Sequence, residues 1–383
     1  MLNRLKSILA DFFQQADLVL LGLCCLSTLY GIALIFSATR YRNSDRYVIV
    51  QAAALLLGIC IYVVLSMVDT ELLMRRWKWV VVFNVLLLLL LIPFGRSDNT
   101  GNRAWLKFPG VPVSISPAEI IKITFTLLLA KQLAWLREER QDLRSARAAF
   151  ACGGHMAALC GLYYVLSKDM GNALVFVFIF LCMAFVAGFA WRWFALLFAG
   201  GGGAVAAAFA LGLVPDYMEN RFRVLLDHIY RPMNEGWQQT RSLLTIGSGG
   251  LWGQGWLHGT QTQAAEGSLP ARHTDFIFAV AGEELGLVGC LVILLLLGAI
   301  IIRILMVARR AQNAFRCYVC VGIAAMMIFQ VVINVGMCLF VMPVIGLTLP
   351  FFSYGGSSVV TLFAAMGIVS GIKKGAWTGN RSR

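Results

Sequence analysis

Charged side chains are scarce in this sequence. Only 13% of its 383 residues are Asp, Glu, Lys or Arg, whereas a soluble protein of this length carries about a quarter. Hydrophobic residues make up 59%, and several apolar runs reach the roughly 20 residues that a helix needs to cross a bilayer. The composition therefore excludes an ordinary soluble domain and predicts an all-α, polytopic integral membrane protein.

The sequence also lacks a pattern that would pair its cysteines. The ten cysteines lie almost wholly in apolar runs, where a thiol behaves as a small hydrophobic group. Cys317 and Cys320 form a single C-x-x-C, with no second pair and no histidine partner, so neither a metal site nor a redox site is indicated. No disulfide framework is expected, because the longest polar region contains no cysteine.

The net charge of +13 does not indicate nucleic-acid binding. The basic residues lie mostly in short loops between apolar runs, which is typical of membrane topology and of contact with anionic lipids. The first apolar run, near residues 18–38, is too long for the core of a signal peptide and is expected to be a retained helix.

We predict ten spanning helices in a single transmembrane domain covering residues 1–383. They lie near residues 17–38, 48–67, 78–95, 113–134, 148–167, 171–189, 191–211, 275–303, 315–341 and 350–372. The loops after the even-numbered helices carry most of the short-loop basic residues, which places those loops and both termini in the cytoplasm. The long loop 212–274, between helices seven and eight, then faces outward.

This outer loop combines two kinds of sequence. "YMENRFRVLLDHIYRP" is amphipathic and predicts a short surface helix, whereas "TIGSGGLWGQGWLHGTQTQ" is rich in Gly and Trp. Trp residues suit a membrane interface. The loop is therefore either a plain interfacial segment or one wall of a site for an amphiphilic substrate, and the sequence leaves both readings open.

Three carboxylates occur close together in "RHTDFIFAVAGEELG". Asp275 either caps a helix N-terminus or serves a function. In a continuous helix, Glu283 would lie about 12 Å deeper on roughly the same face, and Glu284 would point nearly the opposite way. We therefore expect Asp275 and Glu283 to line one cavity and Glu284 to pair with another helix.

Two other segments place polar residues in the membrane. In "SISPAEIIKI", Glu119 and Lys122 are i,i+3 neighbours, which predicts either a self-neutralising ion pair or a polar cavity wall. In "LPFFSYGGSS", Pro350 is expected to open the last helix. Its early small and hydroxyl residues, Ser353 among them, either pack against other helices or line a site.

These segments together resemble the SEDS family of peptidoglycan glycosyltransferases. The motifs that carry the resemblance are "SPAEIIKI", "SLLTIGSGGLWGQGWLHGTQTQ", "SLPARHTDFIFAVAGEELGLVG" and "INVGMCLFVMPVIGLTLPFFSYGGSS", and they extend over nearly the whole chain. "GWLHGTQTQ" followed by "RHTDFIFAV" is more similar to the elongation branch, RodA, than to the division branch, FtsW.

The resemblance implies a ten-helix enzyme of the bacterial inner membrane that polymerises lipid II, with Asp275 as the essential carboxylate. We expect Asp275 to act as general base in an inverting transfer. The leaving pyrophosphate needs positive charge, from a basic side chain such as Arg223 or from a divalent cation, Mg²⁺ or Mn²⁺; no organic cofactor is expected. The candidate substrate-binding residues are Glu119, Lys122, Arg272, His273, Glu283, Arg221, Arg241 and Ser353.

The resemblance also implies partners, namely a class B penicillin-binding protein and other proteins of the elongation complex. Two other classes stay open. Buried Glu, Lys and Asp would also suit a flippase for a lipid-linked substrate, although Asp275 lies near one face and no internal repeat is found. A purely scaffolding homologue would be expected to lack Asp275.

Overall fold

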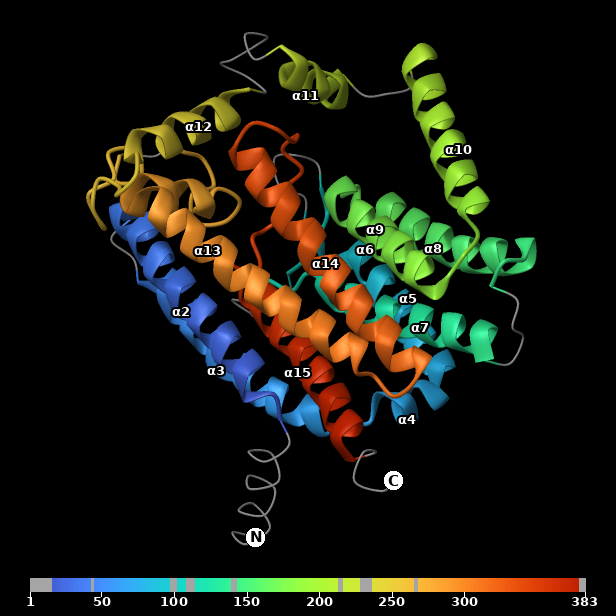
Figure 1. Ribbon diagram of the computed structural model, residues 1–383. Helices are drawn as coiled ribbons and strands as arrows, with labels where there is room; N and C mark the ends of the chain where they lie inside the picture. Colours follow the sequence, from blue (N-terminus) through green and yellow to red (C-terminus); the bar gives the residue numbers. More distant parts are fainter. Residues whose placement is uncertain are drawn as a thin grey trace, which may run out of the picture.

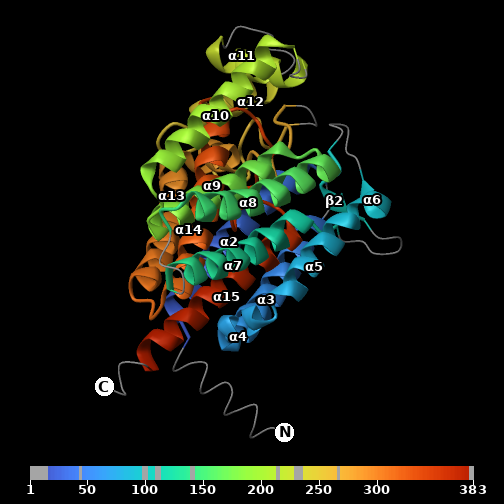
Figure 2. The same cartoon turned by 90° about the vertical axis from the view of Figure 1, so that its right-hand side faces the viewer.

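The structure is a bundle of long helices, seen from two directions in Figures 1 and 2. It is a computed structural model that describes residues 16–42, 45–96, 102–107, 114–138, 143–212, 216–227, 236–264 and 268–378. Within these ranges the only sheet pairs β1 (Gly95–Arg96) with β2 (Trp105–Leu106) in antiparallel register. The expected all-α membrane fold is confirmed.

Every expected span has a helical counterpart. In the described part of the chain, nine helices are long and apolar enough to cross a membrane. They are α2 (Leu18–Thr39), α3 (Arg46–Met67), α5 and α6 together (Trp77–Leu89 and Leu91–Phe94), α8 (Ala146–Ser167), α9 (Met170–Ala187), α10 (Trp191–Ala210), α13 (Ile277–Arg309), α14 (Ala314–Cys338) and α15 (Gly356–Thr378). The remaining counterpart is α7 (Pro117–Glu138), which is 22 residues long and whose mean hydropathy is lowered by its charged residues.

Shorter elements gather at the two ends of the bundle. Figure 2 shows α4 (Thr70–Arg75) near one end and α11 (Asp216–Leu226) with α12 (Trp237–Gly249) near the other. A single 3₁₀ turn, Arg40–Arg42, continues α2. The expected surface helix in the long loop is α11.

The Gly-rich part of the long loop begins inside α12, a helix that the sequence did not predict. Helix α12 lies against α13 so closely that a Cβ on Gly249 would approach the Gly282 carbonyl oxygen to 1.9 Å. Ser242 donates to the Cys338 carbonyl at 2.9 Å, and Gln239 donates to the Met342 carbonyl at 2.7 Å. Glycine at position 249 thus permits close helix packing, and α12 forms a wall on α13 and α14.

The last helix begins later than expected, at Gly356 instead of near Pro350. The intervening residues turn back on themselves: the Ser353 hydroxyl accepts from the Leu349 N–H at 2.8 Å and donates to the Thr274 carbonyl at 2.6 Å. Phe351 adopts a positive φ of 68°, which a helix does not allow. Ser353 therefore fixes a turn and is not an early residue of a helix.

The first and last spans meet at one end of the bundle. The buried Asp17, which caps α2, accepts from Arg303 of α13 at 2.8 Å and pairs with Lys373 of α15 at 3.3 Å. Its backbone N–H donates to the Ser370 hydroxyl at 2.9 Å. The start of α2 and the end of α15 therefore lie together, as an even number of spans requires.

Candidate functional site

Asp275 lies in a turn just before α13, not inside the helix. The N-cap position of α13 is Phe276 and no side chain caps it, so the capping explanation for Asp275 is wrong. The Asp275 carbonyl accepts from the Asn334 side chain at 2.9 Å, and the same amide group donates to the Leu347 carbonyl at 2.7 Å. Helix α14 thereby fixes Asp275 against the segment that precedes α15.

The Asp275 carboxyl group interacts electrostatically with a second carboxylate, Asp169, across an intervening segment of backbone. A Cβ on Gly346 would lie 3.9 Å from Asp275 Oδ2, and a Cβ on Gly171 would lie 2.5 Å from the Ile345 carbonyl oxygen. The 345–346 backbone thus separates the start of α9 from Asp275. Burial raises the pKa of Asp275 to about 6, and the negative charge of Asp169 adds to the effect.

The Asp169 side chain is held in place by several hydrogen-bond donors. It caps α9 through the Asn172 N–H at 3.3 Å, and it accepts from the Asn172 amide at 2.8 Å and from the Tyr163 hydroxyl at 2.8 Å. Asp169 was not among the expected site residues. The available signal was the polar stretch "SKDMGN" between two apolar runs.

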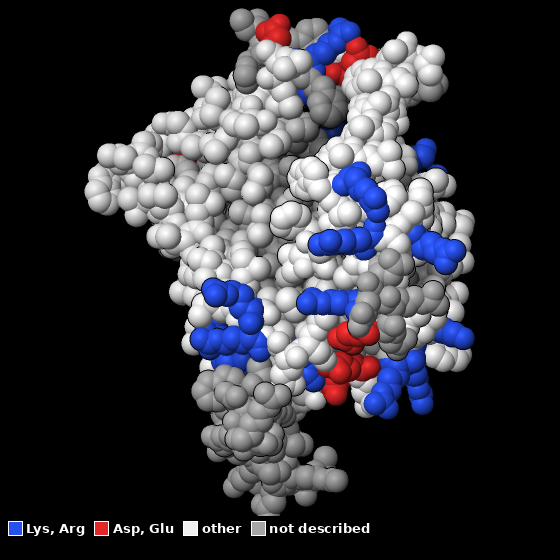
Figure 3. Space-filling view, turned by 45° about the vertical axis from the view of Figure 1, so that its right-hand side comes forward, with Lys and Arg blue, Asp and Glu red and all other residues white. Residues whose placement is uncertain are grey.

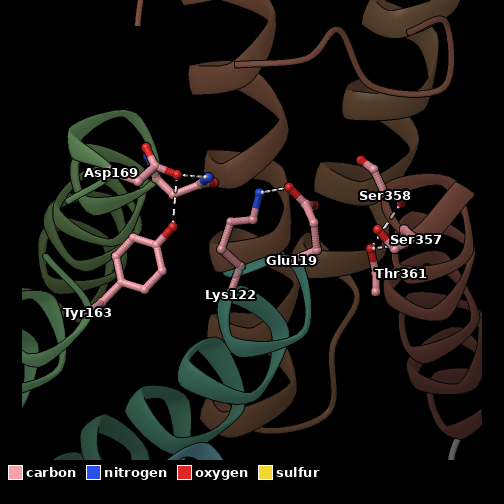
Figure 4. Close-up of polar contacts among 8 residues, drawn as sticks. Glu119, Lys122, Tyr163, Asp169, Ser357, Ser358 and Thr361 are labelled. Carbon is pink, nitrogen blue, oxygen red and sulfur yellow. Dashed lines mark hydrogen bonds and ion pairs between the residues drawn. The ribbon is translucent and has the colours of Figure 1, made fainter. Parts of the chain in front are cut away.

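The Glu119–Lys122 ion pair exists and lies in the interior of the bundle. Lys122 Nζ is 2.7 Å from Glu119 Oε1, and the two side chains are 0% and 9% exposed. Figure 4 shows the lysine reaching between the Tyr163–Asp169 group and the glutamate, with the start of α15 beyond it. The pair therefore neutralises itself beside the second carboxylate of the site.

Several polar oxygens around this region have no hydrogen-bond partner among the described residues. They are Asn172 Oδ1, Gln330 Oε1, Asn334 Oδ1 and Ser357 Oγ. Buried polar atoms are normally satisfied, so such a group needs a reason. These oxygens can accept from the hydroxyl and amide groups of a polar ligand or from water.

Glu283 does not share a cavity with Asp275, so that expectation is wrong. One carboxylate oxygen accepts from the Thr260 hydroxyl at 3.1 Å and the Gln261 N–H at 2.7 Å. The other accepts from the Thr262 N–H at 2.8 Å and the Thr262 hydroxyl at 2.6 Å. Four donors occupy the carboxylate, which therefore holds the backbone of the outer loop.

Glu284 behaves as expected and pairs with another helix. Its Oε1 accepts from the Ser37 hydroxyl of α2 at 2.6 Å and from the Gln263 amide at 3.0 Å. Within the described ranges, Oε2 has no hydrogen-bond partner.

Arg272 is buried in the loop that Glu283 holds. Its side chain is 2% exposed, and Nη1 donates to three carbonyls, those of Gln261 at 3.2 Å, Thr262, and Ala264 at 3.0 Å. The guanidinium also stacks 3.8 Å from the centre of the Tyr41 ring. This geometry makes Arg272 a positioning residue for the turn that carries Asp275.

His273 packs in an aromatic group with Tyr47 and Tyr354, with ring centres 4.9 and 5.8 Å away. Burial and then the charges of Arg42 and Arg272 lower its pKa to about 4, so His273 is neutral at pH 7. It cannot supply positive charge for a leaving pyrophosphate near neutral pH.

The two other expected arginines differ in their surroundings. Arg221 of α11 donates to the Val344 carbonyl at 2.6 Å, which brings it to the segment that carries Gly346. Arg241 of α12 stacks on Trp237, 4.2 Å from the ring centre. Of these two arginines, Arg221 is the one that contacts the backbone beside Asp275, through the Val344 carbonyl.

The donor set permits a divalent cation but does not form a closed site. No group of three His, Cys, Asp or Glu side chains suited to a metal occurs among the residues described. Asp275 supplies one carboxylate, with Asp169 beyond the 345–346 backbone, and Mg²⁺ is commonly held by one or two carboxylates together with substrate phosphates and water. A cation bound mainly by its substrate therefore fits, and its presence stays a prediction.

A family model described as "Cell cycle protein", which covers FtsW, RodA and SpoVE, matches residues 13–376. The chain belongs to this family. It is 34% identical over 322 residues to the peptidoglycan glycosyltransferase MrdB of Escherichia coli K12, covering 82% of each chain. It is 33% identical over 374 residues to the probable peptidoglycan glycosyltransferase FtsW of Trichlorobacter lovleyi, covering 94% of each.

Solved structures of similar proteins support the same assignment. The rod shape determining protein RodA of Thermus thermophilus is 29% identical, with a TM-score of 0.67 over 94% of this chain and 98% of its own. A chain from a peptidoglycan synthase complex that coordinates polymerization and crosslinking is 31% identical, with a TM-score of 0.78 over the same shares. The expected family and enzyme class are thus confirmed. The branch is not resolved, because this chain is almost equally similar to relatives from the elongation and division branches.

Proposed function

We propose that this family member polymerises lipid II into glycan strands, with Asp275 as the general base. The observation that carries the proposal is the placement of Asp275: Asn334 of α14 holds its backbone carbonyl and also bonds the segment before α15, and burial raises the pKa of its carboxyl group to about 6. A base is most effective when its pKa lies near the working pH. Asp275 would be largely deprotonated at pH 7 and still basic enough to accept a proton.

In the proposed reaction, Asp275 removes the proton from the 4-hydroxyl of the acceptor GlcNAc. The oxygen attacks the anomeric carbon of the donor MurNAc, and the bond to the lipid pyrophosphate breaks as the β-1,4 bond forms with inversion. Arg221, at the segment beside Asp275, is the first candidate for contact with the leaving phosphates, because arginine binds phosphate in bidentate geometry. A divalent cation, where bound, would be held by Asp275 together with the substrate phosphates and would offset their charge.

The test is lipid II polymerisation by purified protein. Asp275→Asn keeps the shape of the side chain and removes the base, and we expect the rate to fall about 10²–10⁴-fold. Asp45→Asn is the matched control, since Asp45 is exposed at the start of α3 and makes no capping bond. Polymer formation by Asp275→Asn at the control's rate would reject the assignment, and polymer made in detergent argues against a flippase.

We also propose the elongation branch and its partners for this chain. The resemblance of "GWLHGTQTQ" and "RHTDFIFAV" to RodA supports this branch, and a similar chain in a peptidoglycan synthase complex supports pairing with a penicillin-binding protein. The test is rescue of rod shape in cells depleted of RodA, with cells depleted of FtsW in parallel. Rescue of division alone would reject the elongation assignment.

The same proposal places Asp275 and the long loop outside the cytoplasm of a bacterial inner membrane. The basic loops and the shared end of α2 and α15 support cytoplasmic termini. A fluorescent protein that matures only in the cytoplasm, fused to the C-terminus, should be bright. A fusion that is inserted in the membrane but dark would show that the C-terminus lies outside the cytoplasm, and would refute the proposed topology.

A further inference from the structure

A cavity lies between α8, α9 and α10, away from the site that contains Asp275. Its volume is about 480 Å³, within the roughly 300–1,000 Å³ of typical ligand pockets. Its walls are formed only by apolar, aromatic and glycine residues, including Phe150, Gly154, Phe180, Phe194 and Gly200. Such a lining suits hydrocarbon and offers no partner to a sugar or a phosphate.

The cavity exists because its walls carry small residues and because α10 stands apart from the bundle (Figure 1). A Cβ on Gly153 or Gly154 of α8, or on Gly200 or Gly201 of α10, would meet nothing within 4 Å. Only 6% of the apolar window of α10 is buried. In a membrane, this cavity would be surrounded by the hydrocarbon chains of the bilayer lipids.

One rim of the cavity carries arginines. Arg144 and Arg147 flank the start of α8 and Arg192 lies at the start of α10, and all three are exposed. Arg192 donates to the Arg144 carbonyl at 3.0 Å, and the indole N–H of Trp193 donates to the same oxygen at 3.2 Å. Trp193 also lines the cavity. The Arg144 carbonyl therefore connects an arginine of the rim, Arg192, with a residue of the apolar lining, Trp193.

Basic side chains are numerous on one face of the molecule. Figure 3 shows Lys and Arg side chains spread over the middle and lower parts of that face. Arg144, Arg147 and Arg192 are distinguished by their place beside an apolar cavity. A headgroup phosphate and its acyl chains would meet both kinds of surface at once.

We propose that this cavity is a binding site for an anionic glycerophospholipid. An acyl chain fills the space between α8, α9 and α10, and the phosphate lies against Arg144, Arg147 and Arg192. Trp193 takes the boundary position between chain and headgroup that tryptophan prefers in membranes. The occupant is a bilayer lipid and not the sugar end of the polymerisation substrate, because the lining offers no partner to a sugar, and Asp169 lies 12 residues beyond Ala157, the nearest lining residue of α8, or about 18 Å at a helical rise.

The test measures lipid binding to the purified full-length protein by native mass spectrometry. Phosphatidylglycerol and phosphatidylcholine with identical acyl chains are the probes. Each arginine near an anionic headgroup contributes about a fivefold factor, so the wild-type protein should bind phosphatidylglycerol tenfold or more tightly. Arg147→Gln/Arg192→Gln removes two such factors and should lose about 25-fold for phosphatidylglycerol and little for phosphatidylcholine.

Two matched controls make the result specific. Arg309→Gln/Arg310→Gln removes the same charge from exposed positions at the end of α13 and should leave both affinities unchanged. Gly154→Leu fills the cavity and should weaken both lipids, whereas Gly161→Leu, on the same helix but outside the cavity, should not. Equal losses in the controls, or full binding by Gly154→Leu, would overturn the proposal. So would displacement of phosphatidylglycerol by an equal concentration of undecaprenyl phosphate.

Discussion

Glu283→Gln is expected to loosen the outer loop beside Asp275. Glutamine keeps the size of the side chain but replaces one carboxylate oxygen with an NH₂ group. Each Glu283 oxygen accepts from two donors. In either orientation of the glutamine amide, its NH₂ group therefore faces two hydrogen-bond donors from which it cannot accept. Hydrogen bonds to charged groups contribute about 1.5–3 kcal/mol each, which gives a local loss of about 3–6 kcal/mol.

Hydrogen exchange can measure this loss directly, because two of the donors are the backbone N–H groups of Gln261 and Thr262. A loss of this size corresponds to exchange about 10²–10⁴-fold faster at these amides, at about 1.4 kcal/mol per tenfold. The carbonyls of the same loop hold Arg272. Polymerisation should therefore also slow, on the order of 10²-fold if Asp275 moves by about 1 Å.

Glu284→Gln is the control, because it is the same substitution one residue away in an equally buried side chain. Its Oε1 keeps both donors, and Oε2 has no partner within the described ranges. An NH₂ group at the Oε2 position therefore displaces no hydrogen bond, and exchange should stay within about threefold of wild type. Equal exchange at Gln261 and Thr262 in the two variants would refute the reasoning.

Three further predictions concern charges near the site. Asp275 acts when deprotonated, so the polymerisation rate should rise with pH through the pKa of Asp275, about 6. Asp169→Asn removes a negative charge that raises the pKa of Asp275, so it should move the midpoint of the rate profile to lower pH. Lys122→Met leaves Glu119 buried without its partner and should destabilise the protein by about 3–5 kcal/mol, whereas the double variant with Glu119→Gln should recover most of the loss in a thermal unfolding assay in detergent. Arg272→Lys keeps the charge but loses the planar group that contacts three carbonyls; we expect a slow enzyme, and wild-type turnover would show that charge alone matters.

Hydropathy predicted the spans because a bilayer forces every spanning segment to satisfy its own backbone hydrogen bonds. The same reasoning failed where the chain leaves the regular helix. Asp275 and Glu283 were expected on one face of a continuous helix, but α13 begins only at Ile277, so Asp275 lies in the preceding turn and not in the same helix. The true partners of Glu283 come from a loop 21 to 23 residues earlier.

The role of the Gly-rich segment around Gly249 was left open for a related reason. Its composition suited an interfacial segment or a wall of a site, and only the structure shows that Gly249 permits the close approach of two helices. Asp169 was missed because its importance depends on the folding of the 345–346 backbone between α9 and Asp275. Contacts of this kind depend on tertiary structure and leave no periodic signal in the sequence.

The contacts of Asp17 have a consequence for the order in which the protein is assembled. This buried carboxylate caps the first described span, yet its partners Arg303 and Lys373 lie 286 or more residues later in the chain, as does Ser370, which accepts from the Asp17 backbone N–H. During synthesis the ribosome completes α2 long before any of them exists. The charge must therefore stay hydrated at the membrane surface until α13 and α15 have been inserted, so closure of this end of the bundle is among the last steps of biogenesis.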